Sequence, residues 1–122
     1  MKKLVLDLPI QLHEAIIIGK NHRFVTPVGE FNNVVVTGLG GSGIGGSIVQ
    51  NFVFDKLSIP FIVNKDYSLP AFVNRKSLVI VCSYSGNTEE TLAAMKQAIK
   101  KRATVVCITY GGAVEDLAGK KN

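Results

Sequence analysis

The chain has 122 residues, of which 47% are hydrophobic and 19% are charged, and this composition fits one compact domain with its own core. Its apolar runs are far shorter than the roughly 18 residues that a membrane-spanning helix needs, so we expect no membrane segment. The net charge of +5 is spread along the chain, and only 7% of the residues are aromatic, which argues against nucleic-acid binding. Cys82 and Cys107 lie in apolar runs without metal-ligand spacing. These features predict a cytoplasmic protein without a structural metal or a disulfide.

The first 30 residues are predicted to form a helical segment that precedes the first strand. Apolar residues recur at helical spacing from Leu8 to Lys20, and Pro9 stands where a proline suits the first turn of a helix. We expect this helix to cover the sheet or a partner subunit.

Short runs rich in Val and Ile follow, and stretches with helical signals separate them. Continuous apolar runs of this length are typical of strands buried on both faces of a parallel sheet. The runs are 34–37, 60–63, 77–82 and 104–109, and the helices are expected over 43–55, 88–102 and 113–120. The alternation predicts an α/β fold, a three-layer αβα domain with the common 2-1-3-4-5 strand order. Because such sheets commonly have five or more strands, we expect residues 1–122 to be a partial domain, truncated after its fourth strand.

The helix over 88–102 has the clearest boundaries. We expect Asn87 or Thr88 to cap it, Glu89 and Glu90 to interact with the positive end of its dipole, and a basic cluster over 96–102 to close it. Its apolar stripe consists of Leu92, Met95 and Ile99.

Polar loops follow the first and third predicted strands. Residues 37–46 contain a run of glycines that lets backbone N–H groups approach an anion, and residues 83–88 carry serine and threonine hydroxyls before a helix. Because ligands of such sheets bind at the carboxyl ends of the strands, we expect both loops to converge on one crevice that holds a phosphate without basic residues. Each loop alone also has a purely structural explanation, which is tight helix packing for the glycines and capping for the hydroxyls.

A dinucleotide-binding fold is a competing interpretation. Gly38, Gly40 and Gly43 match the glycine spacing of dinucleotide-binding loops, and Asp66 lies about 20 residues further on, where an acidic residue would bind a ribose. This interpretation leaves the hydroxyl-rich 83–88 loop unexplained. An NAD-dependent oxidoreductase fragment therefore stays an alternative.

The stretches Val36-Thr37-Gly38-Leu39-Gly40-Gly41-Ser42-Gly43 and Ser83-Tyr84-Ser85-Gly86-Asn87-Thr88-Glu89-Glu90-Thr91 resemble the two signature loops of the SIS (sugar isomerase) domain. Lys65-Asp66-Tyr67 after the second strand and Thr109-Tyr110-Gly111-Gly112 after the fourth extend this resemblance to the bifunctional phosphoglucose/phosphomannose isomerases. The similarity runs from about Phe31 to Asp116.

The resemblance implies a flavodoxin-like domain in a homodimeric isomerase that interconverts glucose 6-phosphate or mannose 6-phosphate with fructose 6-phosphate, without a cofactor. It assigns the phosphate to the hydroxyls of Ser83, Ser85 and Thr88 with help from Ser42, and it brings Gly40 and Gly41 close to the sugar. In the family, a glutamate base, an arginine and a histidine come from chain beyond the position of Asn122. No catalytic residue is therefore expected within this chain, and a non-catalytic sugar-phosphate sensor is a second alternative.

The remaining polar residues near the loops are expected to have structural roles. Strand alternation turns Tyr84 away from its serine neighbours, which favours packing in the core or an interface. A turn role is at least as good an explanation for Asp66 and Tyr67 as a role in shaping the crevice.

Overall fold

A parallel sheet with the strand order β2-β1-β3-β4 forms the centre of the molecule. The computed structural model describes residues 1–22 and 29–119. The strands are β1 (Asn33–Thr37), β2 (Phe61–Asn64), β3 (Ser77–Ser83) and β4 (Thr104–Thr109). The helices are α1 (Lys2–Leu6), α2 (Leu8–Asn21), α3 (Gly40–Val53), α4 (Glu89–Lys100) and α5 (Gly112–Gly119). The predicted α/β class is confirmed, and the strand order matches the first four positions of the predicted one.

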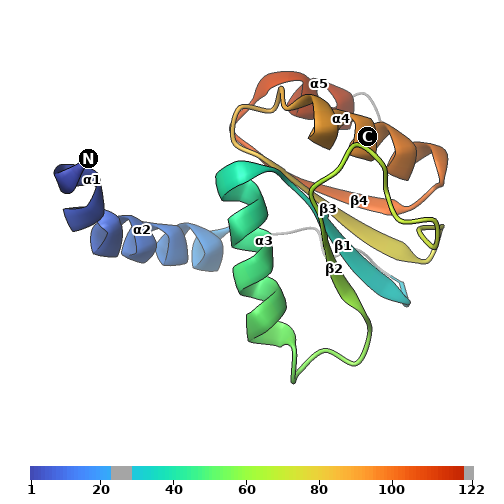
Figure 1. Cartoon of the computed structure of the whole chain (residues 1–122), viewed down its shortest axis with the longest axis horizontal. Coiled ribbons are helices and arrows are strands. Elements are labelled where there is room, and N and C mark those ends of the chain that lie inside the picture. Colours follow the sequence, from blue (N-terminus) through green and yellow to red (C-terminus); the bar gives the residue numbers. More distant parts are fainter. Residues whose placement is uncertain (23–28, 120–122) are drawn as a thin grey trace.

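The helices lie on both faces of the sheet, as Figure 1 shows, with α3 on one face and α4 and α5 on the other. The core cluster lies on the α4 side, because alternate residues of β3 point there and are buried. It joins sheet, helices and the loop after β2 through Val35, Val79, Val81, Leu69, Val73, Ala94, Met95, Ala98 and Val114. The predicted stripe of α4 is confirmed, since Met95 is fully buried and Leu92 and Ile99 pack against the same cluster.

Helix α3 approaches the other face of the sheet at a glycine. A Cβ on Gly46 would lie 3.0 Å from Cγ1 of Val36 and 3.4 Å from Cγ1 of Val63. The helix begins at Gly40, earlier than predicted, because the glycines that were expected to form a loop build its first turn instead. Its positive end therefore lies directly after β1.

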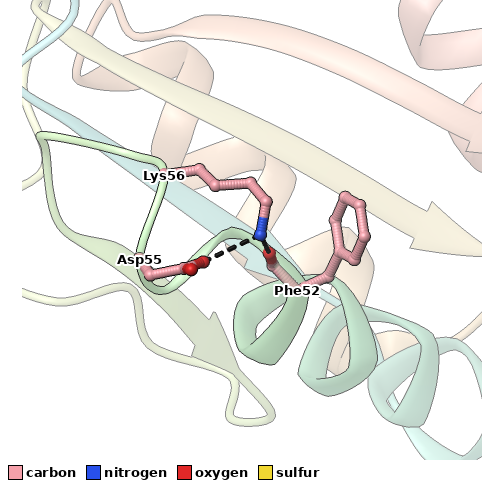
Figure 2. Close-up of polar contacts among 3 residues, drawn as sticks. All are labelled: Phe52, Asp55 and Lys56. Atoms are coloured by element: carbon pink, nitrogen blue, oxygen red, sulfur yellow. Dashed lines mark hydrogen bonds and ion pairs between the residues drawn. The ribbon is translucent and has the colours of Figure 1, made fainter.

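A lysine closes the other end of α3 (Figure 2). Nζ of Lys56 donates hydrogen bonds to the carbonyl oxygen of Phe52 at 3.0 Å and to Oδ1 of Asp55 at 2.8 Å, and it lies 4.8 Å from the centroid of the Phe52 ring. A cation at the carboxyl end of a helix interacts favourably with the negative end of its dipole. At this end of α3, a carbonyl oxygen and the negative end of the helix dipole thus have a partner within the chain.

The amino-terminal helices extend away from the sheet (Figure 1). Pro9 lies in the first turn of α2, as predicted, but no residue of α2 is buried. Of the two roles predicted for this helix, covering the sheet of its own chain is therefore wrong, and covering a partner subunit stays a prediction. Part of the predicted segment, residues 23–28, and Lys120 of the predicted last helix lie outside the described residues. Within the described ranges, none of the helices is both long and apolar enough to cross a membrane.

Adding a methyl group at Gly46 tests the contact between α3 and the sheet. We expect the free energy of unfolding of Gly46→Ala to be lower than that of Gly45→Ala by about 1 to 3 kcal/mol. The methyl group at position 46 is forced against Val36, whereas a Cβ at position 45 meets open space. Urea unfolding of both variants measures the difference. Equal stability would show that α3 can move away from β1 at little cost.

Candidate functional site

The two predicted loops leave neighbouring strands at the carboxyl edge of the sheet. Parallel pairing aligns Thr37 of β1 with Val81 of β3, so the chains that leave these strands start side by side. A Cβ on Gly38 would lie only 3.0 Å from the carbonyl oxygen of Cys82. The loop over residues 37–46, called the glycine loop below, and the 83–88 loop therefore start from adjacent strands, at the position where doubly wound sheets bind ligands.

The 83–88 loop is organised by its own hydroxyls. The Oγ atom of Ser83, a buried residue, accepts a hydrogen bond from the backbone N–H of Gly86 at 3.1 Å and lies 3.1 Å from Oγ1 of Thr88. Ser85 is exposed, and its Oγ accepts a hydrogen bond from the N–H of Asn87 at 3.2 Å. The structure thus brings Ser83, Ser85 and Thr88 together in one short turn.

Thr88 occupies the N-cap position of α4, but its side chain makes no capping hydrogen bond. Its hydroxyl contacts Ser83 instead, so the prediction of a side-chain cap from this residue is wrong. Glu89 and Glu90 lie in the first turn, as predicted. The first amides of a helix without a side-chain cap remain available to an anion.

Glycines lock the 83–88 loop against the turn after β4. Gly86 has a φ of +69°, and a Cβ there would overlap the carbonyl group of Gly111. Asn87 bridges the same two segments, because its Oδ1 accepts a hydrogen bond from the N–H of Ala113 at 3.0 Å. The N–H of Val114 donates to the carbonyl oxygen of Gly86 at 3.0 Å. Sequence reasoning missed this brace, although the Gly111-Gly112 pair was a signal for it.

The glycine loop places its candidate residues in the first turn of α3. Gly40 has a φ of +56°, which favours glycine, whereas Gly41 is exposed and a Cβ there would meet nothing within 4 Å. Backbone geometry therefore explains the glycine at position 40, whereas neither backbone geometry nor packing explains the one at position 41. An exposed glycine without a packing role is suited to the close approach of a ligand.

Ser42 makes no hydrogen bond to the other hydroxyls of the predicted site within the described residues. It lines an apolar hollow of about 680 Å³ on the α3 side of the sheet, and this hollow includes none of Ser83, Ser85 and Thr88. Tyr84 and Tyr110 form its rim, and their rings stack with centroids 5.6 Å apart. Tyr84 is 78% exposed, so of the two packing roles predicted for it the core is wrong, and packing in an interface stays a prediction. The hollow is the part of the sheet face beside α3 that no helix covers. Because its lining is mostly apolar, we assign polar contacts with a ligand to the two loops instead.

The residues that follow β2 lie at the same edge of the sheet. Oδ1 of Asp66 accepts a hydrogen bond from the N–H of Tyr67 at 2.7 Å, which fits the turn role, and a role of Asp66 in shaping the crevice stays a prediction. The negative charge of Glu90, followed by desolvation and the charge of Glu89, raises the pKa of the Tyr67 phenol. Tyr67 therefore lies close to the first turn of α4. On the sheet itself, burial raises the pKa of the Cys82 and Cys107 thiols, which favours their neutral form.

A family model described as the SIS domain matches residues 30–115 of this chain. The chain belongs to the SIS domain family. The match begins before β1 and ends within α5, so it contains both loops and the brace between them. The resemblance drawn from the loop residues is thereby confirmed, and the dinucleotide-binding interpretation is not needed to explain the glycines.

Curated relatives carry names from sugar-phosphate chemistry. A bifunctional phosphoglucose/phosphomannose isomerase of Caldicellulosiruptor bescii is 50% identical over 98% of this chain and 35% of the relative. A protein of the same name from Thermoplasma acidophilum is 47% identical over 73% of this chain and 28% of the relative. A D-glucosamine-6-phosphate 4-epimerase of Sulfolobus acidocaldarius is 33% identical over 81% of this chain and 31% of the relative. The chain spans about a third of the length of these relatives.

Solved structures share the fold. A crystal structure of a protein from Clostridium difficile 630 matches with a TM-score of 0.76 and 21% identity, over 92% of this chain and 34% of that one. A tagatose-6-phosphate ketose/aldose isomerase from Escherichia coli matches with a TM-score of 0.60 and 18% identity, over 94% of this chain and 33% of that one. At these identities the likeness supports the fold and nothing further.

The brace at Gly86 is open to a direct test. We expect Gly86→Ala to destabilise the chain by roughly 2 to 4 kcal/mol, because the methyl group adds left-handed backbone strain to an overlap with Gly111. Gly119→Ala is the matched control, since a Cβ there meets open space. Urea unfolding compares the two variants. Near-wild-type stability of Gly86→Ala would show that the brace does not hold the 83–88 loop against Gly111.

Proposed function

We propose that this SIS domain is the sugar-phosphate-binding part of an isomerase that interconverts glucose 6-phosphate or mannose 6-phosphate with fructose 6-phosphate. The observation that carries the proposal is that the glycine loop and the 83–88 loop leave the adjacent strands β1 and β3 at the same edge of the sheet. The names of the curated relatives supply the substrate class.

In this proposal, the 83–88 loop binds the phosphate. The hydroxyls of Ser83, Ser85 and Thr88 and the first amides of α4 are donors for its oxygens, and the positive end of the helix dipole favours the dianion. Gly40 and Gly41 let the sugar approach the backbone of α3. Ser42 completes the set from the α3 side, although no hydrogen bond of the described structure links it to the 83–88 loop. Binding of this kind requires neither a metal nor a nucleotide.

We place the general base in chain that these residues do not include. Aldose–ketose isomerisation moves a proton between adjacent carbons, so a base must reach the carbon next to the carbonyl group. Glu89 and Glu90, the carboxylates that follow the 83–88 loop directly, lie in the first turn of α4, where we assign them to the helix dipole. Support for this placement also comes from the length of the relatives, of which this chain spans about a third.

Location and assembly follow as further parts of the proposal. A cytoplasmic location is supported by the free thiols of Cys82 and Cys107, which suit a reducing compartment. A homodimer is supported by α2, whose apolar side chains are exposed, with Leu12 at 57% and Ile16 at 55%. Light scattering of the purified protein decides between monomer and dimer.

The phosphate site predicts a specific effect of one hydroxyl. Ser85→Ala should weaken binding of glucose 6-phosphate by about 1 to 3 kcal/mol, because the variant loses a hydrogen bond to a charged oxygen. Ser58→Ala, which removes an exposed serine before β2, should bind as wild type. Isothermal titration calorimetry with glucose 6-phosphate measures the affinity of both variants. A separate titration with NAD tests the oxidoreductase alternative. Unchanged affinity of Ser85→Ala would reduce Ser85 to a turn residue, and binding of NAD alone would favour an oxidoreductase.

The proposed division between binding and catalysis predicts a separation of the two activities. The 122-residue chain should bind glucose 6-phosphate and yet form no fructose 6-phosphate above background, because the base is placed elsewhere. A coupled assay for fructose 6-phosphate measures turnover. Robust turnover would show that one of the residues present here acts as the base.

A further inference from the structure

Lys65 reaches the first turn of α3 from the end of β2. Pairing of β1 with β2 aligns Thr37 with Asn64, and the N–H of Gly38 donates to the carbonyl oxygen of Asn64 at 3.2 Å. The next residue along the chain is Lys65. A Cβ on Gly43 would lie 3.4 Å from Cε of Lys65 and 2.7 Å from the carbonyl oxygen of Gly38. The lysine stem therefore runs along the base of the glycine loop.

The segment that carries Lys65 also reaches the 83–88 side of the edge. Tyr67 lies near the carboxylates of Glu90 and Glu89 in the first turn of α4. The side chain of Gln97 holds the segment there, since its amide donates to the carbonyl oxygen of Tyr67 at 2.7 Å and accepts from the N–H of Leu69 at 3.1 Å. Residues 65–67 thus extend from the start of one loop to the helix that follows the other.

The charge of Lys65 is not neutralised within the described chain. Its side chain has no ion pair among residues 1–22 and 29–119. The neighbouring Asp66 accepts a hydrogen bond from the N–H of Tyr67. An ammonium group close to the positive end of α3 is unfavourable in isolation, because both carry the same sign of charge. A bound anion between the loops would turn both into favourable interactions.

We propose that Lys65 is a substrate-binding residue, whose ammonium group supplies positive charge to the phosphate of the sugar phosphate held between the two loops. The inference rests on the proposed function and changes one part of it. The hydroxyl and amide donors position the phosphate, and Lys65 adds an attraction that depends on the charge of the ligand. In this arrangement the donors that contact the phosphate within the two loops are neutral, and Lys65 beside the glycine loop provides the positive charge.

Charge removal that retains the stem provides the test. Lys65→Met should raise the dissociation constant for glucose 6-phosphate and for inorganic phosphate about five-fold at low salt, whereas Lys65→Arg should stay within about two-fold of wild type. Lys76→Met is the matched control, because it removes the same charge from an exposed lysine at the amino end of β3. The loss in Lys65→Met should shrink as the salt concentration rises from about 20 mM to about 500 mM, since salt screens charges and leaves hydroxyl contacts in place.

The outcomes separate this inference from the function it extends. If Ser85→Ala weakens binding while Lys65→Met binds as wild type at every salt concentration, Lys65 has no role in binding and the proposed function stands. If Lys76→Met loses as much affinity as Lys65→Met, the effect comes from net charge, and the inference is wrong. If the wild-type chain binds neither ligand, the proposed function and this inference both fail.

Discussion

The hydrogen-bonded pairing of β1 with β3 is the constraint on which the rest of the site depends. These strands are separated in sequence by β2 and its loop, yet they lie side by side in the sheet, with Thr37 beside Val81. Each is followed by a helix, and α3 and α4 leave toward opposite faces (Figure 1). The positive ends of both helices therefore meet at one edge, which no single strand–helix unit could achieve.

Neutral donors can only discriminate a ligand when they are held in place, and the brace after β4 provides that rigidity. Hydrogen bonds hold the 83–88 loop in two ways. The hydroxyl of Ser83 accepts one from the loop backbone, and the N–H groups of Ala113 and Val114 donate to the loop from α5. Gly86 and Gly112 have positive φ angles of +69° and +74° where the two segments meet. Preorganised donors lose little freedom when a ligand binds, so in the proposed site weak individual hydrogen bonds would add up to selective binding.

The sequence predicted the parts that local patterns determine. Buried Val and Ile runs identified all four strands of the described sheet, and the apolar stripe located the buried face of α4. Contacts between segments distant in sequence were not accessible in this way. Tyr84 stacks on Tyr110 of the turn after β4, and Asn87 accepts a hydrogen bond from the N–H of Ala113 in α5. A local pattern assigns a side chain by its neighbours in sequence, whereas neighbours in space decided these contacts.

The loop after β2 shows how one segment can connect packing to charge at the edge. Leu69 and Val73 are buried in the core, and Gln97 and Lys101 of the α4 end bind the backbone of the same loop. That packing fixes where Lys65 and Tyr67 emerge, one beside the glycine loop and the other beside the acidic first turn of α4. Because the core positions these side chains, the balance of charge around the two loops follows from hydrophobic packing as well as from the residues of the loops themselves.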